Sequence, residues 1–92
     1  MNKFKLGQLV VTRAIDERMD SDLGFQDFVK QSLSRYIHRD WGDTCREDSR
    51  ANDLAVRNGE RILAVYIYKG ETIWIITEWD RSVTTILFPS DY

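Results

Sequence analysis

Apolar residues in the first half of the chain recur at the helical period. Between residues 25 and 37 they fall at offsets of 0, 3, 4, 8, 11 and 12, which gathers them on one face of a helix. The residues of this stripe are Phe25, Phe28, Val29, Leu33, Tyr36 and Ile37. We predict a helix that starts after Ser21 or Asp22, ends near His38 and buries this stripe.

Two weaker helical segments flank this one. The segment from Arg13 to Asp22 is predicted to form a short helix with Thr12 as its N-cap. The sequence Thr44 to Glu47 matches a capping box, so another helix should begin there and end at Asn58-Gly59, where glycine can adopt the left-handed conformation. Because its apolar stripe is narrow, we expect this last helix to bury only part of one face against the core.

The remaining apolar runs are short and rich in β-branched and aromatic residues, as is typical of strands. They lie at 8–12, 62–67, 73–76 and 86–88. Connections of hairpin length join the last three, so these strands should be antiparallel neighbours. The order strand, helices, three strands predicts an α+β fold of two layers, in which the helices pack on one face of a three- to four-stranded antiparallel sheet.

The strand at 73–77 is apolar on both alternating faces, with Ile73 and Ile75 on one and Trp74 and Ile76 on the other. This pattern indicates burial on both sides of the sheet. Helices can cover one side, and a second copy of the chain could cover the other, so a homodimer is a reasonable hypothesis.

Composition narrows the class of protein. Ninety-two residues fit a single domain spanning 1–92. The net charge of -2 lacks the basic excess of a dedicated nucleic-acid binder. A single cysteine, Cys45, rules out an internal disulfide and favours a reducing compartment, so we expect a cytoplasmic protein. The sequence contains no apolar run long enough for a signal peptide or a membrane-spanning helix.

Known catalytic and ligand-binding patterns are missing from the sequence. His38 is the only histidine, which excludes histidine pairs for catalysis or metal binding. The five glycines do not form a phosphate-binding loop. Cys45 lies near a predicted helix start, but a packing role is the more common one for such a cysteine. We therefore predict no catalytic residues, no metal and no cofactor.

Two places remain as candidate binding sites. The first is the hairpin tip formed by Glu78, Trp79, Asp80 and Arg81, whose aromatic and charged side chains are typical of protein interfaces; a purely structural turn is an equally good interpretation. The second is the helix face that carries Asp48 and Asn52. For these two residues, hydrogen bonds to loop backbone, for example near Trp41-Gly42, are the favoured alternative.

Four segments carry a resemblance to a known group of proteins. They are Trp41-Gly42-Asp43, Glu47-Asp48, Ala51-Asn52-Asp53 and the run from Ile73 to Pro89, and they resemble a family of small uncharacterised proteins of bacterial plasmids and integrated mobile elements. The resemblance implies a bacterial cytoplasm and names no chemistry. Together with the absent catalytic set, it predicts a non-enzymatic accessory protein that acts by binding an unknown partner protein.

The alternative is an enzyme. A strand, two helices and a three-stranded meander are similar in layout to the RelE/ParE-like toxins, in which basic and aromatic side chains on the sheet cleave RNA. Arg61, Tyr66 and Arg81 could form such a set. The net charge argues against docking on ribosomal RNA.

Overall fold

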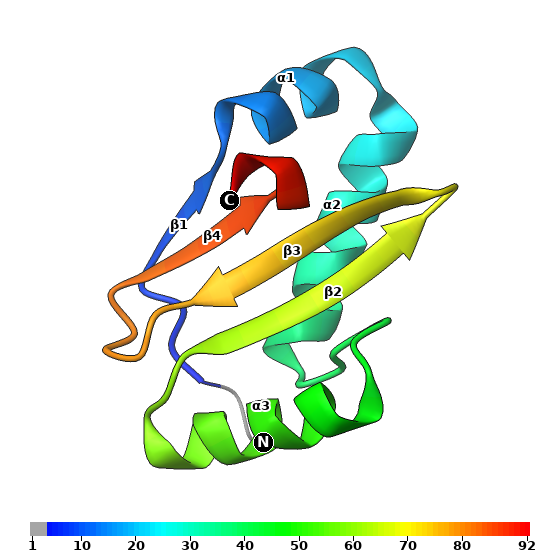
Figure 1. Ribbon diagram of the computed structural model, residues 1–92. Helices are drawn as coiled ribbons and strands as arrows, with labels where there is room; N and C mark the ends of the chain where they lie inside the picture. Colours follow the sequence, from blue (N-terminus) through cyan, green and yellow to red (C-terminus); the bar gives the residue numbers. More distant parts are fainter. Residues whose placement is uncertain (1–3) are drawn as a thin grey trace.

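The computed structural model describes residues 4–92 and shows a four-stranded sheet with helices behind it and beside it (Figure 1). The elements, in chain order, are β1 (Gln8–Val11), α1 (Arg13–Ser21), α2 (Leu23–Ile37), α3 (Arg46–Asn58), β2 (Ile62–Tyr68), β3 (Glu71–Thr77), β4 (Val83–Leu87) and the 3-10 turn η1 (Pro89–Asp91). The strand order across the sheet is β1-β4-β3-β2. The predicted α+β class and element order are confirmed.

The sheet is mixed, which corrects the prediction of an antiparallel sheet. β2, β3 and β4 form the expected antiparallel meander, but β1 pairs with β4 in parallel. The path of the chain explains this direction. α2 carries the chain back to the end of the sheet where β1 began, so β2 runs in the same direction as β1 (Figure 1). Two hairpins connect β2 to β3 and β3 to β4, so β4 has the same direction as β2 and β1. The pairing of β1 with β4 is therefore parallel.

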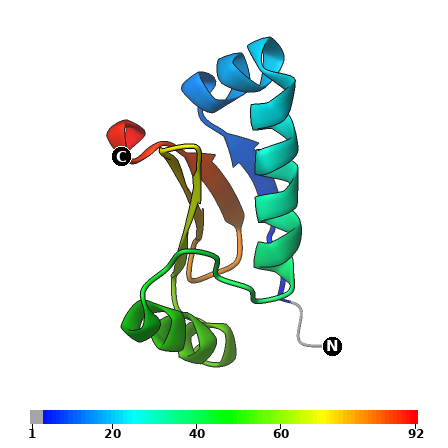
Figure 2. The same cartoon turned by 90° about the vertical axis from the view of Figure 1, so that its right-hand side faces the viewer.

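The helices do not all share one face of the sheet. α2 covers one face, which we call the inner face, and α1 packs against the end of α2 (Figure 2). α3 instead lies alongside the edge strand β2 (Figure 1). The prediction that the helices pack together is right for α2 and wrong for α3, because the narrow apolar stripe of α3 can cover only an edge.

The core lies between α2 and the inner face. From α2 the buried side chains are Phe25, Val29, Ser32 and Tyr36. From the strands they include Ile62, Ala64, Tyr66, Ile73, Ile75 and Ile86. The buried stripe of α2 is thus turned slightly from the predicted one. Phe28 and Leu33 sit at its border and are only partly buried.

A chain of buried hydroxyl groups crosses this core. Tyr36 Oη lies 2.7 Å from Thr77 Oγ1, which lies 2.7 Å from Thr84 Oγ1. Thr84 donates to the carbonyl of Leu6 at 2.8 Å. Since Thr84 uses its proton there, Thr77 donates to Thr84 and Tyr36 donates to Thr77. The chain ties α2, both central strands and the segment before β1 together, and burial raises the pKa of the Tyr36 hydroxyl.

Most of the predicted helix caps are confirmed. Thr12 accepts from the N–H of Ile15, Asp22 accepts from the N–H of Phe25, and Gly59 closes α3 with a φ of 70°. The prediction of a capping box at Thr44 is wrong. Cys45 is the N-cap of α3, and its side chain forms no capping hydrogen bond. Cys45 is exposed, so the expected packing role is wrong as well.

The face of the sheet turned away from α2, which we call the outer face, is partly covered by the chain's own end. Ile76 and Leu87 point to this side and are nevertheless 3% and 5% exposed. The ring of Tyr92, which follows η1, meets Trp74 edge-on at 5.7 Å. Burial on both sides of β3 is thus confirmed, and the homodimer stays a prediction. None of the helices in residues 4–92 is long and apolar enough to cross a membrane.

The orientation of α2 makes a clear stability prediction. Phe25 is 1% exposed and should cost about 3–5 kcal/mol on replacement by alanine, through lost burial and a cavity. The matched change Phe28→Ala should cost about 1–2 kcal/mol, since that ring is already partly in water. Denaturant unfolding of both variants measures the difference. Equal losses would show that α2 turns a different face toward the sheet.

Candidate functional site

The loop between β3 and β4 is fixed in place by Arg81. This residue adopts a φ of 60°, and its guanidinium donates to the carbonyls of Ala55 at 2.8 Å and Glu60 at 2.7 Å. It also reaches the carbonyls of Glu78 and Trp79 within its own loop, at 3.1 and 3.4 Å. A planar fork with several donors suits this task. Arg81 therefore binds the hairpin tip to the C-terminal end of α3, where the helix dipole favours a positive charge.

The remaining polar groups of the loop are also used locally. Asp80 accepts from the N–H of Ser82 at 3.0 Å. Hydrogen bonding with the side chain of Ser82 first, and with this N–H second, holds the pKa of the Asp80 carboxyl below its usual range. Glu78 lies 3.5 Å from Arg61, with which it forms an ion pair. Asp80 thus caps the backbone of its own turn, as the structural interpretation of the tip predicts.

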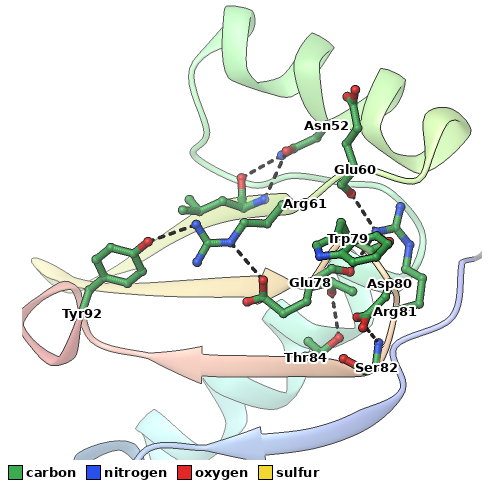
Figure 3. Close-up of polar contacts among 12 residues, drawn as sticks. Asn52, Glu60, Arg61, Glu78, Trp79, Asp80, Arg81, Ser82, Thr84 and Tyr92 are labelled. Atoms are coloured by element: carbon green, nitrogen blue, oxygen red, sulfur yellow. Dashed lines mark hydrogen bonds and ion pairs between the residues drawn. The ribbon is translucent and has the colours of Figure 1, made fainter.

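Trp79 is the one residue of the tip whose side chain is left free in the structure of residues 4–92. It is 67% exposed and makes none of the side-chain hydrogen bonds found among these residues. Figure 3 shows Tyr92, Arg61, Glu78 and Trp79 following one another across the outer face. We call these four residues the aromatic row.

Arg61 holds the centre of the aromatic row. Its guanidinium donates to Tyr92 Oη at 3.0 Å and also lies over the Tyr92 ring, 5.5 Å from its centre. The hydrogen bond with Tyr92, opposed by desolvation and supported by Glu78, raises the pKa of Arg61 above its usual value. Arg61 is thus a permanent cation between two exposed aromatic rings, since Tyr92 is itself 70% exposed.

Asn52 and Asp48, both on α3, differ in burial and in their contacts. Asn52 is 5% exposed, and its side-chain amide donates to the carbonyl of Leu63 at 2.8 Å and accepts from the N–H of Leu63 at 3.2 Å. The amide thereby imitates a neighbouring strand. The alternative interpretation, hydrogen bonds to backbone, is confirmed for Asn52, although the backbone is that of β2 rather than the Trp41-Gly42 loop. Asp48 lies exposed in the first turn of α3, away from the tip.

Sequence reasoning missed the residues that complete this edge. Thr44 Oγ1 accepts from the N–H of Val65 at 2.8 Å, and the N–H of Asp43 donates to the carbonyl of Val65 at 2.8 Å. Asp43 Oδ2 accepts from the N–H of Ile67 at 2.8 Å. The sequence Trp-Gly-Asp-Thr could have indicated these contacts, because Asp and Thr side chains after a glycine commonly form hydrogen bonds with nearby backbone groups.

Gly42 is required where this loop meets the strand. Its φ is 65°, and a Cβ built there would lie 2.4 Å from the Tyr66 ring and 2.8 Å from the carbonyl of Val65. No side chain fits at that distance. The loop therefore approaches β2 closely enough for residues 43 and 44 to reach its backbone.

The three residues proposed for RNA cleavage do not form one site. Tyr66 is fully buried on the inner face, where its hydroxyl donates to the carbonyl of Asp40 at 2.7 Å, and burial raises its pKa. Arg61 belongs to the aromatic row on the outer face. Arg81 is occupied by backbone carbonyls. Nothing in this arrangement lets the three side chains meet one phosphate group.

Residues 4–92 offer little to a metal ion or a cofactor. No three His, Cys, Asp or Glu side chains among them lie close enough to hold a metal ion. A hollow of about 110 Å³ is lined by Arg18, Asp22, Phe25, Tyr68 and Glu71, among others. Arg18 is already paired there with Glu71 at 2.6 Å and Asp22 at 3.6 Å. This hollow is smaller than a typical ligand pocket and its charges are matched.

Comparison with known proteins adds no relative: no family model, no curated protein and no solved structure matches this chain. The function must therefore be inferred from the chain's own residues and their geometry.

Arg81 should be more important for stability than for contact with other molecules. Arg81→Ala removes the donors to Ala55 and Glu60 and should cost about 2–3 kcal/mol. A positive φ is unfavourable for alanine as it is for arginine. The difference in unfolding free energy between the two proteins therefore reports the loss of the Arg81 side-chain contacts. Arg81→Lys should recover only part of the loss, since lysine lacks the planar fork whose two separate nitrogens reach the two carbonyls. Chemical denaturation measures all three proteins, and an unchanged midpoint for Arg81→Ala would contradict the assigned role.

Asn52 offers a pH-dependent test of the edge contact. Asn52→Asp sets a carboxylate against the carbonyl of Leu63, so the variant should lose about 2–3 kcal/mol at neutral pH. The folded state then favours the protonated acid, which can donate to that carbonyl. Its folded pKa is raised, so stability is regained relative to wild type as pH falls through this pKa. Asn52→Ala, which lacks a titrating group, should show no such recovery, and equal pH profiles for the two variants would refute the contact.

Proposed function

We propose that this chain is a non-enzymatic protein-binding module that engages a partner protein through the aromatic row. The observation that carries the proposal is Trp79, a residue 67% exposed on a loop that is held by hydrogen bonds of Asp80 and Arg81. Arg81 ties that loop to α3, and Asp80 closes it on Ser82. An exposed tryptophan on a fixed loop is ready to bind, because little conformational entropy is lost on association.

The neighbours of Trp79 support a protein as the partner. Tyr, Trp and Arg are the residue types that contribute most to binding energy at protein interfaces, and the aromatic row contains one of each. The ion pair between Arg61 and Glu78 leaves the row without net charge. A polyanion is therefore a poor match, whereas a protein surface with an apolar recess for the indole and polar groups around it fits well.

The biological setting is a separate part of the proposal. The resemblance to proteins of bacterial plasmids and integrated mobile elements, which none of the comparisons repeats, suggests an accessory role in the bacterial cytoplasm. It also suggests where to look for the partner, among proteins of the host or of the same element. RNA cleavage has no comparable support, since Arg61, Tyr66 and Arg81 lie apart.

Affinity capture followed by direct binding tests the proposal. The wild type should capture a specific protein from a bacterial lysate, and Trp79→Ala should weaken the purified complex by about tenfold or more. Because Trp79 is exposed, its loss should change the stability of the free module by no more than about 0.5 kcal/mol. Tyr92→Ala should also weaken the complex.

The matched control is Leu23→Ala, a comparably exposed apolar residue at the start of α2. This variant should bind like the wild type. Identical binding by the Trp79→Ala variant, or degradation of RNA by the purified wild type, would overturn the proposal.

A further inference from the structure

The outward-facing backbone groups of the two edge strands, β1 and β2, differ in whether they have hydrogen-bond partners. An edge strand presents a row of unpaired backbone groups that another strand can bind. At β2 this row is closed within the chain. Its bonded groups are the N–H groups of Leu63, Val65 and Ile67 and the carbonyls of Leu63 and Val65.

The corresponding row at β1 is open. The N–H groups of Gln8 and Thr12 donate to β4 and the residue before it, so these residues and Val10 between them direct their backbone groups inward. Successive residues of a strand point opposite ways, and the N–H and carbonyl groups of Leu9 and Val11 therefore point out of the sheet. No hydrogen bond within residues 4–92 reaches these four groups. Figure 1 shows no described segment outside β1.

We propose that β1 pairs antiparallel with β1 of a second copy of this chain, so that one sheet runs through a two-fold symmetric dimer. With the symmetry axis at Val10, Leu9 of one copy stands opposite Val11 of the other. Each such pair exchanges two N–H···O=C hydrogen bonds. All the open groups of both copies are then satisfied.

Side chains and charges favour a second copy as the occupant. Leu9, Val10 and Val11 carry no charge, so the strand does not repel itself, and Leu9 is 45% exposed. Antiparallel pairing also brings the start of one β1 to the end of the other. Lys5, which precedes β1, then lies at the same end as Asp16 in the first turn of α1 of the second copy. The first turn of α1 also holds Arg13, whose charge is paired with Glu17, so Asp16 is the charge at that end with no ion-pair partner among residues 4–92 of its own copy.

Sedimentation and amide hydrogen exchange test this dimer. The wild type should pass from monomer to dimer as its concentration is raised, and the Leu9 and Val11 amides should become protected over the same range. The Val10 amide, already bonded to β4, should be protected throughout. Leu9→Lys should weaken the dimer by about tenfold or more, because each change acts twice in a two-fold interface.

Two further variants separate pairing through β1 from a dimer formed by another face. Leu9→Pro removes the outward N–H, a change that an edge strand tolerates, and should also weaken the dimer while the monomer stays folded. Ile67→Lys places the same charge on the closed edge, at a residue of similar exposure, 51%, and should leave the dimer intact. A monomer at every concentration would overturn the proposal. So would a dimer that Ile67→Lys breaks and Leu9→Lys does not, since that result would assign the interface to the outer face.

Discussion

The closed edge at β2 is the contact on which the rest of this structure depends. A four-stranded sheet has two edges, and a strand edge left in the interior would leave backbone groups without partners. Here side chains from the loop and from α3 take the place of a fifth strand, with Asn52 bonded to both backbone groups of Leu63. This contact fixes α3 beside the sheet instead of on its inner face. In that position the C-terminal end of α3 lies within hydrogen-bond distance of the Arg81 guanidinium. Arg81 therefore fixes the hairpin tip to α3.

The candidate site follows from this arrangement. Arg81 is used to join the tip to α3, so its charge is turned inward to carbonyls instead of outward to a ligand. Trp79, two residues before Arg81, is left exposed on the loop that Arg81 ties to α3. The same bonds that make Arg81 structural therefore make Trp79 a rigid contact point. Tyr92 and Arg61 extend that point across the outer face, and the surface is both aromatic and without net charge.

Much of the fold could be predicted from local patterns. The helix that contains Phe25 and Tyr36, the N-caps Thr12 and Asp22 and the three-stranded meander all follow from short-range rules, and the structure confirms them, with the buried face of the helix turned slightly. The parallel pairing of β1 and the edge position of α3 could not be predicted, because they depend on where distant segments meet. Thr44 shows the difference: locally it matches a capping box, but its hydroxyl accepts from Val65, 21 residues away. The burial of Asn52 and the exposure of Cys45 have the same origin.

Hydrogen exchange of single amides in the wild type tests the closed edge most directly. At a concentration where the chain is monomeric, the amides of Leu63, Val65 and Ile67 point out of the sheet, and only Asn52, Thr44 and Asp43 shield them. If these side chains close the edge, the three amides exchange as slowly as those in the centre of β3. Exchange as fast as that of an open strand edge would show that β2 is not closed, and neither the position of α3 nor the anchoring of the tip could then be explained by this contact.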